Sequence, residues 1–212
     1  MSLPWSRSLR LRVTPHAAWA TLQPGWWGTK ALADAVHPAN AVSNSRDAMP
    51  SSAMAVSIEA LAANIEAVLA QIGRSAAIRG ARLIVEWSDS MTHFDVVSGD
   101  FAGDSDRQLQ AVASACATEL LGEAAQSHEV RWQLQAGGRH LLIAAIPREQ
   151  LKLLDEACQR HGLTLVSVQP DFCTQWNRHA KALKRGPAVF TVASEREAVI
   201  ACVVDGAVAT MS

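Results

Sequence analysis

The segment from His93 to Pro170 constrains the fold of this chain most, because its apolar residues switch repeatedly between strand and helix periods. The pattern predicts the order strand, helix, strand, strand, helix, strand. Gly137-Gly138 joins the two middle strands, and this pair suits the positive φ angles of a two-residue hairpin turn. The order predicts a ferredoxin-like β-α-β-β-α-β module.

The two helices of such a module cover one face of its sheet, so the strands indicate what the other face needs. The strand from Leu141 to Ile146 is apolar at every position and is expected at the centre of the sheet. The strand 129–136 alternates between apolar and polar residues, as an edge strand does. The second face must meet the rest of the chain or a partner, and we expect these residues to bind that partner: Leu142, Ala144, Ile146, Val166 and Val168.

The flanking sequence predicts further strands and helices on either side of this module. Leu9, Leu11 and Val13 alternate with arginines in a half-buried strand, and Ser57 is a suitable N-cap for a helix. Residues 23–57 are rich in Pro, Gly, Ser, Asn and Ala and are predicted to form a long loop. The expected elements outside the module are strands 9–22 and 81–87, helices 58–72 and 171–184, and strands 188–193, 198–204 and 207–211.

Composition excludes several classes of protein. The 212 residues are 49% hydrophobic and 18% charged, which is typical of a globular chain. The formal net charge is −1, so we expect no capture of nucleic acid or of an anionic membrane by overall charge. No apolar run approaches the roughly 20 residues that span a bilayer, and the four cysteines form no metal clip. A reduced, cytoplasmic protein is therefore expected.

No motif predicts catalysis. The sequence contains neither a GxxxxGK phosphate loop nor a GxSxG nucleophile motif, and its histidines lack metal-ligand spacing. We therefore predict no catalytic residues, no cofactor and no metal site. The basic segment 178–185 has two interpretations: a solvated helix end that complements the helix dipole, or a docking patch for an acidic partner.

The segment from Leu141 to Pro170, LLIAAIPREQLKLLDEACQRHGLTLVSVQP, resembles the type IV pilus assembly protein PilM and its relatives. These relatives include the cytoplasmic domain of the type II secretion protein GspL and MshI-like pilus proteins. The resemblance implies an α/β (α+β) fold, in which a ferredoxin-like subdomain is inserted into a partial actin-like, RNase-H-like subdomain. The domains that it implies are 1–92 with 171–212 for the actin-like subdomain, and 93–170 for the inserted one.

Two departures from this family bear on nucleotide binding. The resemblance implies an Asp-x-Gly-type phosphate loop after the first strand, but the sequence there reads Val13-Thr14-Pro15-His16. The second actin-like lobe is also expected to be missing, since the sequence ends at Ser212. We therefore carry over no nucleotide-binding residue from the family.

The function implied is that of a non-enzymatic assembly or scaffold component of a type IV pilus or type II secretion-like machine. It would bind the cytoplasmic tail of a bitopic inner-membrane protein and meet the membrane only through partners. Self-association is a further expectation. Two alternatives remain open: an ATP-binding, actin-like ATPase of the same machinery, and a stand-alone ferredoxin-like domain that binds a ligand.

Overall fold

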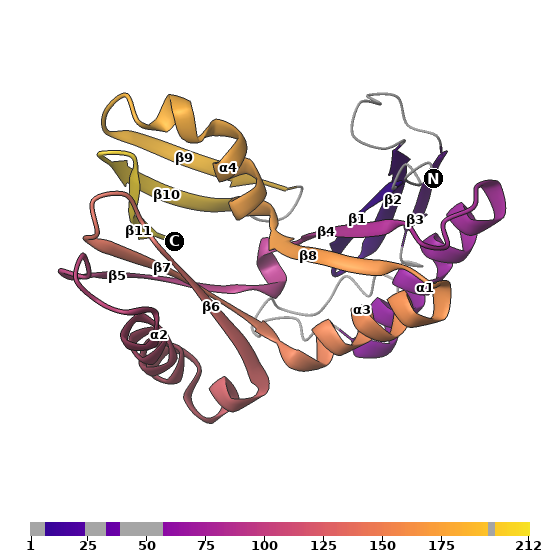
Figure 1. Cartoon of the computed structure of the whole chain (residues 1–212), viewed down its shortest axis with the longest axis horizontal. Helices are drawn as coiled ribbons and strands as arrows, with labels where there is room; N and C mark the ends of the chain where they lie inside the picture. The colour runs from indigo at the N-terminus through magenta and orange to yellow at the C-terminus, as the bar shows by residue number, and fades with distance from the viewer. Residues whose placement is uncertain (1–6, 24–32, 39–56, 195–197) are drawn as a thin grey trace, which may run out of the picture. The chain divides into compact units, whose positions relative to one another are not determined.

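The computed structural model describes residues 7–23, 33–38, 57–194 and 198–212, and these form a mixed α/β structure. The chain divides into two compact units. Unit 1 contains residues 1–91 and 152–168, and unit 2 contains residues 92–151 and 169–212. The elements in Figure 1 are β1 (Ser8–Thr14), β2 (Ala17–Gln23), β3 (Ala33–Pro38), α1 (Ile58–Ser75), β4 (Arg82–Trp87), β5 (His93–Ser98), α2 (Asp106–Leu121), β6 (His128–Leu134), β7 (His140–Pro147), α3 (Arg148–His161), β8 (Thr164–Pro170), α4 (Asp171–Leu183), β9 (Ala188–Ala193), β10 (Ala198–Val204) and β11 (Ala207–Met211), with short 3₁₀ helices at Asp89–Met91 and Gly122–Ser127.

Unit 1 is built on a five-stranded sheet with the strand order β3-β2-β1-β4-β8. Strands β1, β2 and β3 form an antiparallel meander, and β4 pairs with β1 in parallel. The period-2 pattern of β1 buries Leu9, Leu11 and Val13 completely and leaves Arg10 and Arg12 exposed on the other face. The sheet therefore has one apolar face and one largely polar face.

Helices α1 and α3 lie on the same side of this sheet (Figure 1). Ser57 caps α1 as expected, since its hydroxyl accepts a hydrogen bond from the backbone N–H of Ala60. The two helices are joined by Glu66 of α1, which pairs with Arg160 and with His161 (3.0 Å) of α3. The apolar stripe of α1 is buried through Leu61, Ile65, Val68, Leu69 and Ile72.

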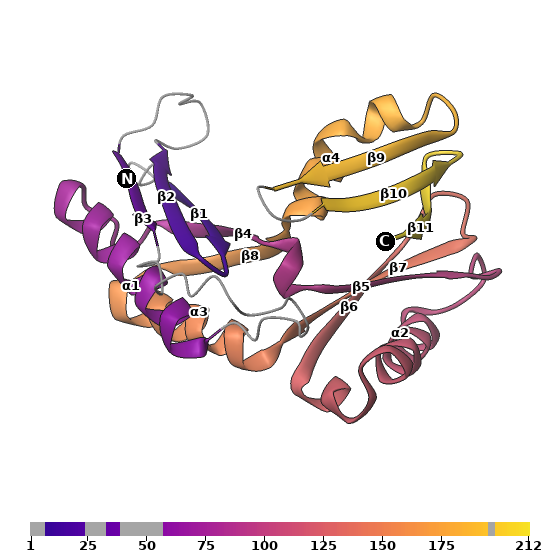
Figure 2. The same ribbon diagram turned by 180° about the vertical axis from the view of Figure 1, so that it is seen from behind.

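Unit 2 contains two three-stranded sheets, β5-β7-β6 and β11-β10-β9. Helix α2 packs on one face of the first sheet, over a core that includes Leu109, Leu141 and Ile143. The other face of this sheet meets α4 and the second sheet, where Leu142 packs in one cluster with Phe172. Figure 2 shows the same elements from behind. The second face of the β5-β7-β6 sheet is thus covered by the chain itself.

The mixed α/β fold is as predicted. The prediction that residues 93–170 form one four-stranded, ferredoxin-like sheet is wrong. Strand β8 pairs with β4 in unit 1, where the N–H of Thr164 donates to the carbonyl of Ala81 (3.0 Å). Most of α3, which precedes β8 in the sequence, also belongs to unit 1. Periodicity predicts a strand at β8 correctly, but a parallel strand after a helix can join either of two apolar neighbours, and periodicity does not say which.

The division into units and the extent of the predicted loop also differ from the prediction. The division between the units falls at residues 91/92, 151/152 and 168/169, so unit 2 takes in α4 and the last three strands as well. The predicted loop 23–57 contains strand β3, which pairs with β2 in an antiparallel register. The rest of that predicted loop lies outside the described residues.

Candidate partner-binding surface

The five residues predicted to bind a partner lie on two different sheets. Leu142, Ala144 and Ile146 belong to β7 in unit 2, whereas Val166 and Val168 belong to β8 in unit 1. The prediction that they share one sheet face is therefore wrong, because β8 pairs with β4 in unit 1 and not with the strands of the β5-β7-β6 sheet.

The β7 residues are poorly suited to binding a partner. Leu142 is 4% exposed and contributes to the cluster that contains Phe172 and Trp176. Ile146 is 8% exposed, and Ala144 is half-buried. An aspartate at Ile146 would bury a carboxylate without a partner and would test folding rather than binding.

The β8 residues lie on the polar face of the five-stranded sheet. The hydrogen bond from Thr164 to Ala81 places Thr164 beside Arg82, and two residues further along a parallel pair Val166 lies beside Ile84. Strand pairing sets Ile84 beside Arg10 and Glu86 beside Arg12. Val166 is 42% exposed. We call the set Arg10, Arg12, Trp19, Arg82, Ile84, Glu86, Val166 and Val168 the outer face of unit 1.

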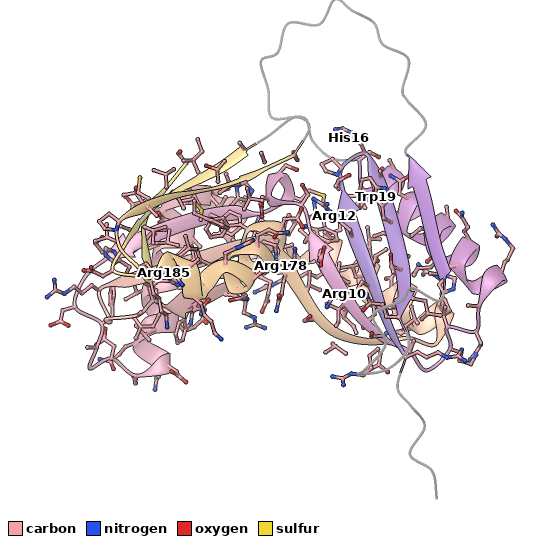
Figure 3. The ribbon with its side chains drawn as sticks, turned by 90° about the horizontal axis from the view of Figure 1, so that it is seen from above. Arg10, Arg12, His16, Trp19, Arg178 and Arg185 are labelled. Carbon is pink, nitrogen blue, oxygen red and sulfur yellow. The ribbon has the colours of Figure 1, made fainter. Side chains whose placement is uncertain are left out.

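The outer face combines an exposed aromatic ring with net positive charge. Trp19 of β2 is 37% exposed and lies opposite Arg12 of β1 in the strand register. Figure 3 shows Arg10, Arg12 and Trp19 along these two neighbouring strands. Arg10 forms an ion pair with Glu86 (3.3 Å), and Arg12 and Arg82 place two further guanidinium groups on the same face. Tryptophan and arginine are the residues most enriched at energetically important positions of interfaces.

Sequence patterns could have indicated part of this surface. The alternation of β1 already places Arg10 and Arg12 together on the polar side of a strand. The contribution of Trp19 depends on the antiparallel register of β1 and β2, and that of Val166 depends on the pairing of β8 with β4. The first pairing is a local hairpin across the turn at Pro15 and His16. The second joins strands far apart in the sequence, and no local pattern reports it.

In the turn after β1, where the family resemblance implies a phosphate loop, the side chain of Thr14 accepts the backbone hydrogen bonds. The hydroxyl Oγ1 of Thr14 accepts hydrogen bonds from the backbone N–H groups of His16 (3.4 Å) and Ala17 (3.1 Å). Pro15 has no N–H to offer. A phosphate cradle depends on such backbone donors pointing at the ligand, and in this turn they point at Thr14 instead.

A polar cavity of about 300 Å³ lies between α2 and β6 in unit 2. Its charged groups satisfy one another: Glu129 pairs with Arg131 (2.8 Å) and with Arg148 (3.4 Å), and Arg148 also donates to the carbonyl of Gln126. An incoming anion would have to displace Glu129 from two arginines, so the cavity offers a weaker site than the outer face.

Two histidines beside this cavity pack edge to face. The rings of His93 and His128 lie 5.4 Å apart, and Nδ1 of His128 donates to the carbonyl of Ala124 (2.7 Å). Burial, and then the neighbouring His128, lower the pKa of His93. In the described part of the chain, no cluster of three or more His, Cys, Asp or Glu residues could hold a metal ion.

The fold is shared with known assembly proteins. The cytoplasmic domain of EpsL, an inner-membrane component of the type II secretion system of Vibrio cholerae, aligns with a TM-score of 0.57 and 11% identity, over 93% of this chain and 68% of that one. A chain of the PilM–PilN type IV pilus biogenesis complex aligns with a TM-score of 0.65 and 12% identity, over 99% of this chain and 61% of that one.

A third structure has the same architecture without a known role. This protein of Bacteroides thetaiotaomicron, which has an actin-like ATPase fold and unknown function, aligns with a TM-score of 0.61 and 9% identity, over 100% of this chain and 72% of that one. At these identities the likenesses establish the actin-like fold alone. The sequence matches no protein-family model and no curated protein. Among the described helices, none has the length and apolar character needed to cross a membrane.

Proposed function

We propose that this chain is a non-enzymatic assembly component of a type IV pilus or type II secretion-like machine, and that it holds a cytoplasmic segment of an inner-membrane partner. The fold shared with EpsL and with the PilM–PilN complex supports the machinery. The outer face of unit 1, with its exposed Trp19 beside Arg12, is the observation that carries the binding role.

The chemistry of the outer face specifies the segment that it would bind. Val166 and Ile84 offer apolar area, while the exposed Arg10 and Arg82 favour carboxylates. A fitting segment carries an apolar or aromatic anchor beside Asp or Glu. Residues next to a membrane span on the cytoplasmic side are enriched in Lys and Arg, so the bound residues would lie further from the membrane in the partner's sequence.

A binding assay with labelled peptides tests this proposal. The probes are the cytoplasmic segments of bitopic inner-membrane proteins encoded beside this chain, and affinity is measured by fluorescence anisotropy. We expect Trp19→Ala and Val166→Asp each to weaken binding about tenfold or more, which is typical of an interface anchor. Leu120→Asp on α2 is the matched control, since Leu120 is 51% exposed but lies in unit 2. Equal affinity for all four proteins would refute the proposed surface.

The actin-like ATPase remains the second candidate, because one structural neighbour carries an actin-like ATPase fold. The closed turn at Thr14 argues against it, since the backbone donors of His16 and Ala17 are already engaged. Isothermal calorimetry with Mg-ATP separates the two. Micromolar binding that Thr14→Val alters would favour the ATPase, whereas no heat of binding supports the assembly component.

A further inference from the structure

One end of unit 1 gathers arginines from separate parts of the sequence. Arg7 precedes β1, Arg74 lies in the last turn of α1, and Arg79 lies in the loop between α1 and β4. Arg82 is the first residue of β4. All four residues are exposed. We call Arg7, Arg74, Arg79 and Arg82 the arginine end of unit 1.

Hydrogen bonds hold the loop between α1 and β4 at the centre of this end. The guanidinium Nη1 of Arg7 donates to the carbonyl of Ala77 (2.7 Å), and the backbone N–H of Arg82 donates to the carbonyl of Arg7 (2.9 Å). The N–H of Gly80 donates to the carbonyl of Gly162 (2.7 Å), at the start of β8. Contacts between residues far apart in the sequence therefore bring the arginines around one short loop.

The loop leaves these arginines accessible. Its side chain at Arg79 lies against Gly162, where an added Cβ would be 3.0 Å from Cγ of Arg79. The exposed residues between the arginines are small, namely Ala77 and Gly80, and a Cβ at Gly80 would meet nothing within 4 Å. The larger Ile78 is buried. A flat surface can therefore approach the loop without first meeting a bulky side chain.

Among the residues that the structure describes, no carboxylate pairs with the arginine end. Glu66 and Glu156 of the two covering helices both pair with Arg160, and Glu86 pairs with Arg10. The formal net charge of the chain is −1, so any attraction for an anion must come from such a local cluster.

The chemistry of this cluster favours phosphate groups on a surface. The planar fork of donors in a guanidinium group matches phosphate oxygens. A free phosphate is usually held by donors that converge in a concave site, whereas this loop is open on its outer side. Proteins that bind single-stranded nucleic acid add aromatic side chains on which the bases stack, and residues 74–82 contain none.

We propose that the arginine end of unit 1 binds the anionic headgroups of a lipid bilayer. The guanidinium groups contact lipid phosphates, and the small residues at Ala77 and Gly80 let the surface come close. Each cation near such a surface strengthens binding about fivefold, so the attachment is weak by itself. It raises the local concentration of any partner anchored in the same membrane. The proposal goes beyond the proposed function and does not depend on it, because a bilayer without protein is sufficient.

Co-sedimentation of the full chain with lipid vesicles tests the proposal. Vesicles of equal parts phosphatidylglycerol and phosphatidylcholine are compared with vesicles of phosphatidylcholine alone. We expect binding to the anionic vesicles only, and a decrease as salt rises, since exposed charges are screened. The combined variant Arg7→Gln, Arg74→Gln, Arg79→Gln should bind about 100-fold more weakly. Arg82 is kept in this variant because it also belongs to the outer face.

Two further variants show whether charge at this place is responsible. The charge-matched control removes three exposed cations from α4 in unit 2 and should bind as wild type does: Arg178→Gln, Lys181→Gln, Arg185→Gln. The double variant Arg74→Gln, Arg79→Gln keeps the hydrogen bond of Arg7 to the loop and should still lose about 25-fold in affinity. Circular dichroism checks that each variant is folded.

Four outcomes would overturn the proposal. Equal binding to both kinds of vesicle would show that anionic headgroups are not recognised. An equal loss in the α4 control would mean that overall charge decides. Release by inorganic phosphate at constant ionic strength would identify a free-phosphate site. Binding to neither kind of vesicle would leave an acidic protein as the occupant. Trp19→Ala should not change vesicle binding, so a failure here and a failure of the proposed function are distinguishable.

Discussion

The two sheets that begin as meanders, β1-β2-β3 in unit 1 and β9-β10-β11 in unit 2, share a strand order but are completed differently. The first continues with the parallel strands β4 and β8, and α1 and α3 cover its inner face. The second stops at three strands in the described structure, and α4 and a second sheet cover its inner face. The first leaves exposed a sheet face that carries Arg10, Trp19 and Val166, whereas the second encloses a cluster around Phe172.

The interiors differ accordingly. The core of unit 1 is mostly aliphatic, with Leu9, Leu11 and Leu83 completely buried. The core between α4 and the sheets of unit 2 is aromatic: Phe172 contacts Phe94, Trp176 and Phe190 at ring separations of 5.6–6.0 Å. Helices supply long aliphatic stripes, whereas one helix between two short sheets must fill space with large rings. This comparison leads to four predictions, taken from the largest effect to the smallest.

Phe172→Ala should cause the largest loss of stability. Phe172 is completely buried and contacts three other aromatic rings, so truncation removes its transfer free energy and leaves a cavity. We expect the free energy of unfolding to fall by about 3–5 kcal/mol, as measured by urea denaturation. Trp19→Ala on the outer face of unit 1 is the control, with an expected loss below about 1 kcal/mol. Similar losses in the two variants would contradict the distinction between core and surface aromatics.

The hairpin turns of the two units should respond differently to substitution. Gly138 in the β6–β7 turn has a φ of +69°, and a Cβ there would lie 2.9 Å from the Cβ of Ala102. Gly138→Ala should therefore destabilise by about 1–3 kcal/mol. Thr14→Val in the β1–β2 turn loses one hydroxyl and should destabilise by about 1 kcal/mol. Gly103→Ala is the control, since a Cβ there meets nothing within 4 Å. A Gly138→Ala protein as stable as Gly103→Ala would refute the assigned turn geometry.

Local patterns predicted the elements of both units well. The α1 stripe, the Ser57 cap and the Gly137-Gly138 turn each depend on residues close in sequence, and each is present. The pairing of β8 was missed because it depends on two strands more than 75 residues apart. β8 joins β4 through backbone hydrogen bonds such as that from Thr164 to Ala81, which no local pattern encodes.

The candidate site was predictable only in part for the same reason. Val166 and Val168 were correctly identified as apolar strand residues, but their predicted neighbours Leu142 and Ile146 are buried in unit 2. A predicted surface inherits any error in strand pairing, because pairing decides which residues share a face. The basic segment 178–185 could be recognised in the sequence, because its residues are consecutive.

The N-caps of α1 and α2 offer a smaller test of how the two units differ. Ser105 of α2 forms a capping box, in which its N–H donates to Oε1 of Gln108 (2.9 Å). Ser57 of α1 lacks this partner, since alanine occupies position 60. Ser57→Ala and Ser105→Ala should each cost about 1 kcal/mol. Ala60→Gln should stabilise α1 by completing a box, and a destabilised Ala60→Gln protein, measured by thermal unfolding, would count against this reading.

The ion pairs of Glu66 in α1 with Arg160 and His161 in α3 should contribute the least to stability, and their contribution should depend on pH. Burial raises the pKa of Glu66, but hydrogen bonds from Arg160 and His161 outweigh it and place the net pKa below the ordinary 4.5. A carboxyl whose pKa is lower in the folded state stabilises the fold above its unfolded pKa, and this contribution is lost as pH falls through the folded pKa.

Glu66→Gln should therefore lower stability by less than about 1 kcal/mol at neutral pH, because the pair is partly exposed to solvent. The difference between wild type and variant should shrink as pH falls below the ordinary value of 4.5. Urea denaturation across this pH range measures it, and Glu149→Gln on the first turn of α3 is the control. Part of the loss of stability of unit 1 in acid would then come from the ion pairs of Glu66 with α3. The apolar cluster around Phe172 in unit 2 has no such dependence on pH. A difference that stays constant down to acid pH would mean that Glu66 does not act through its charge.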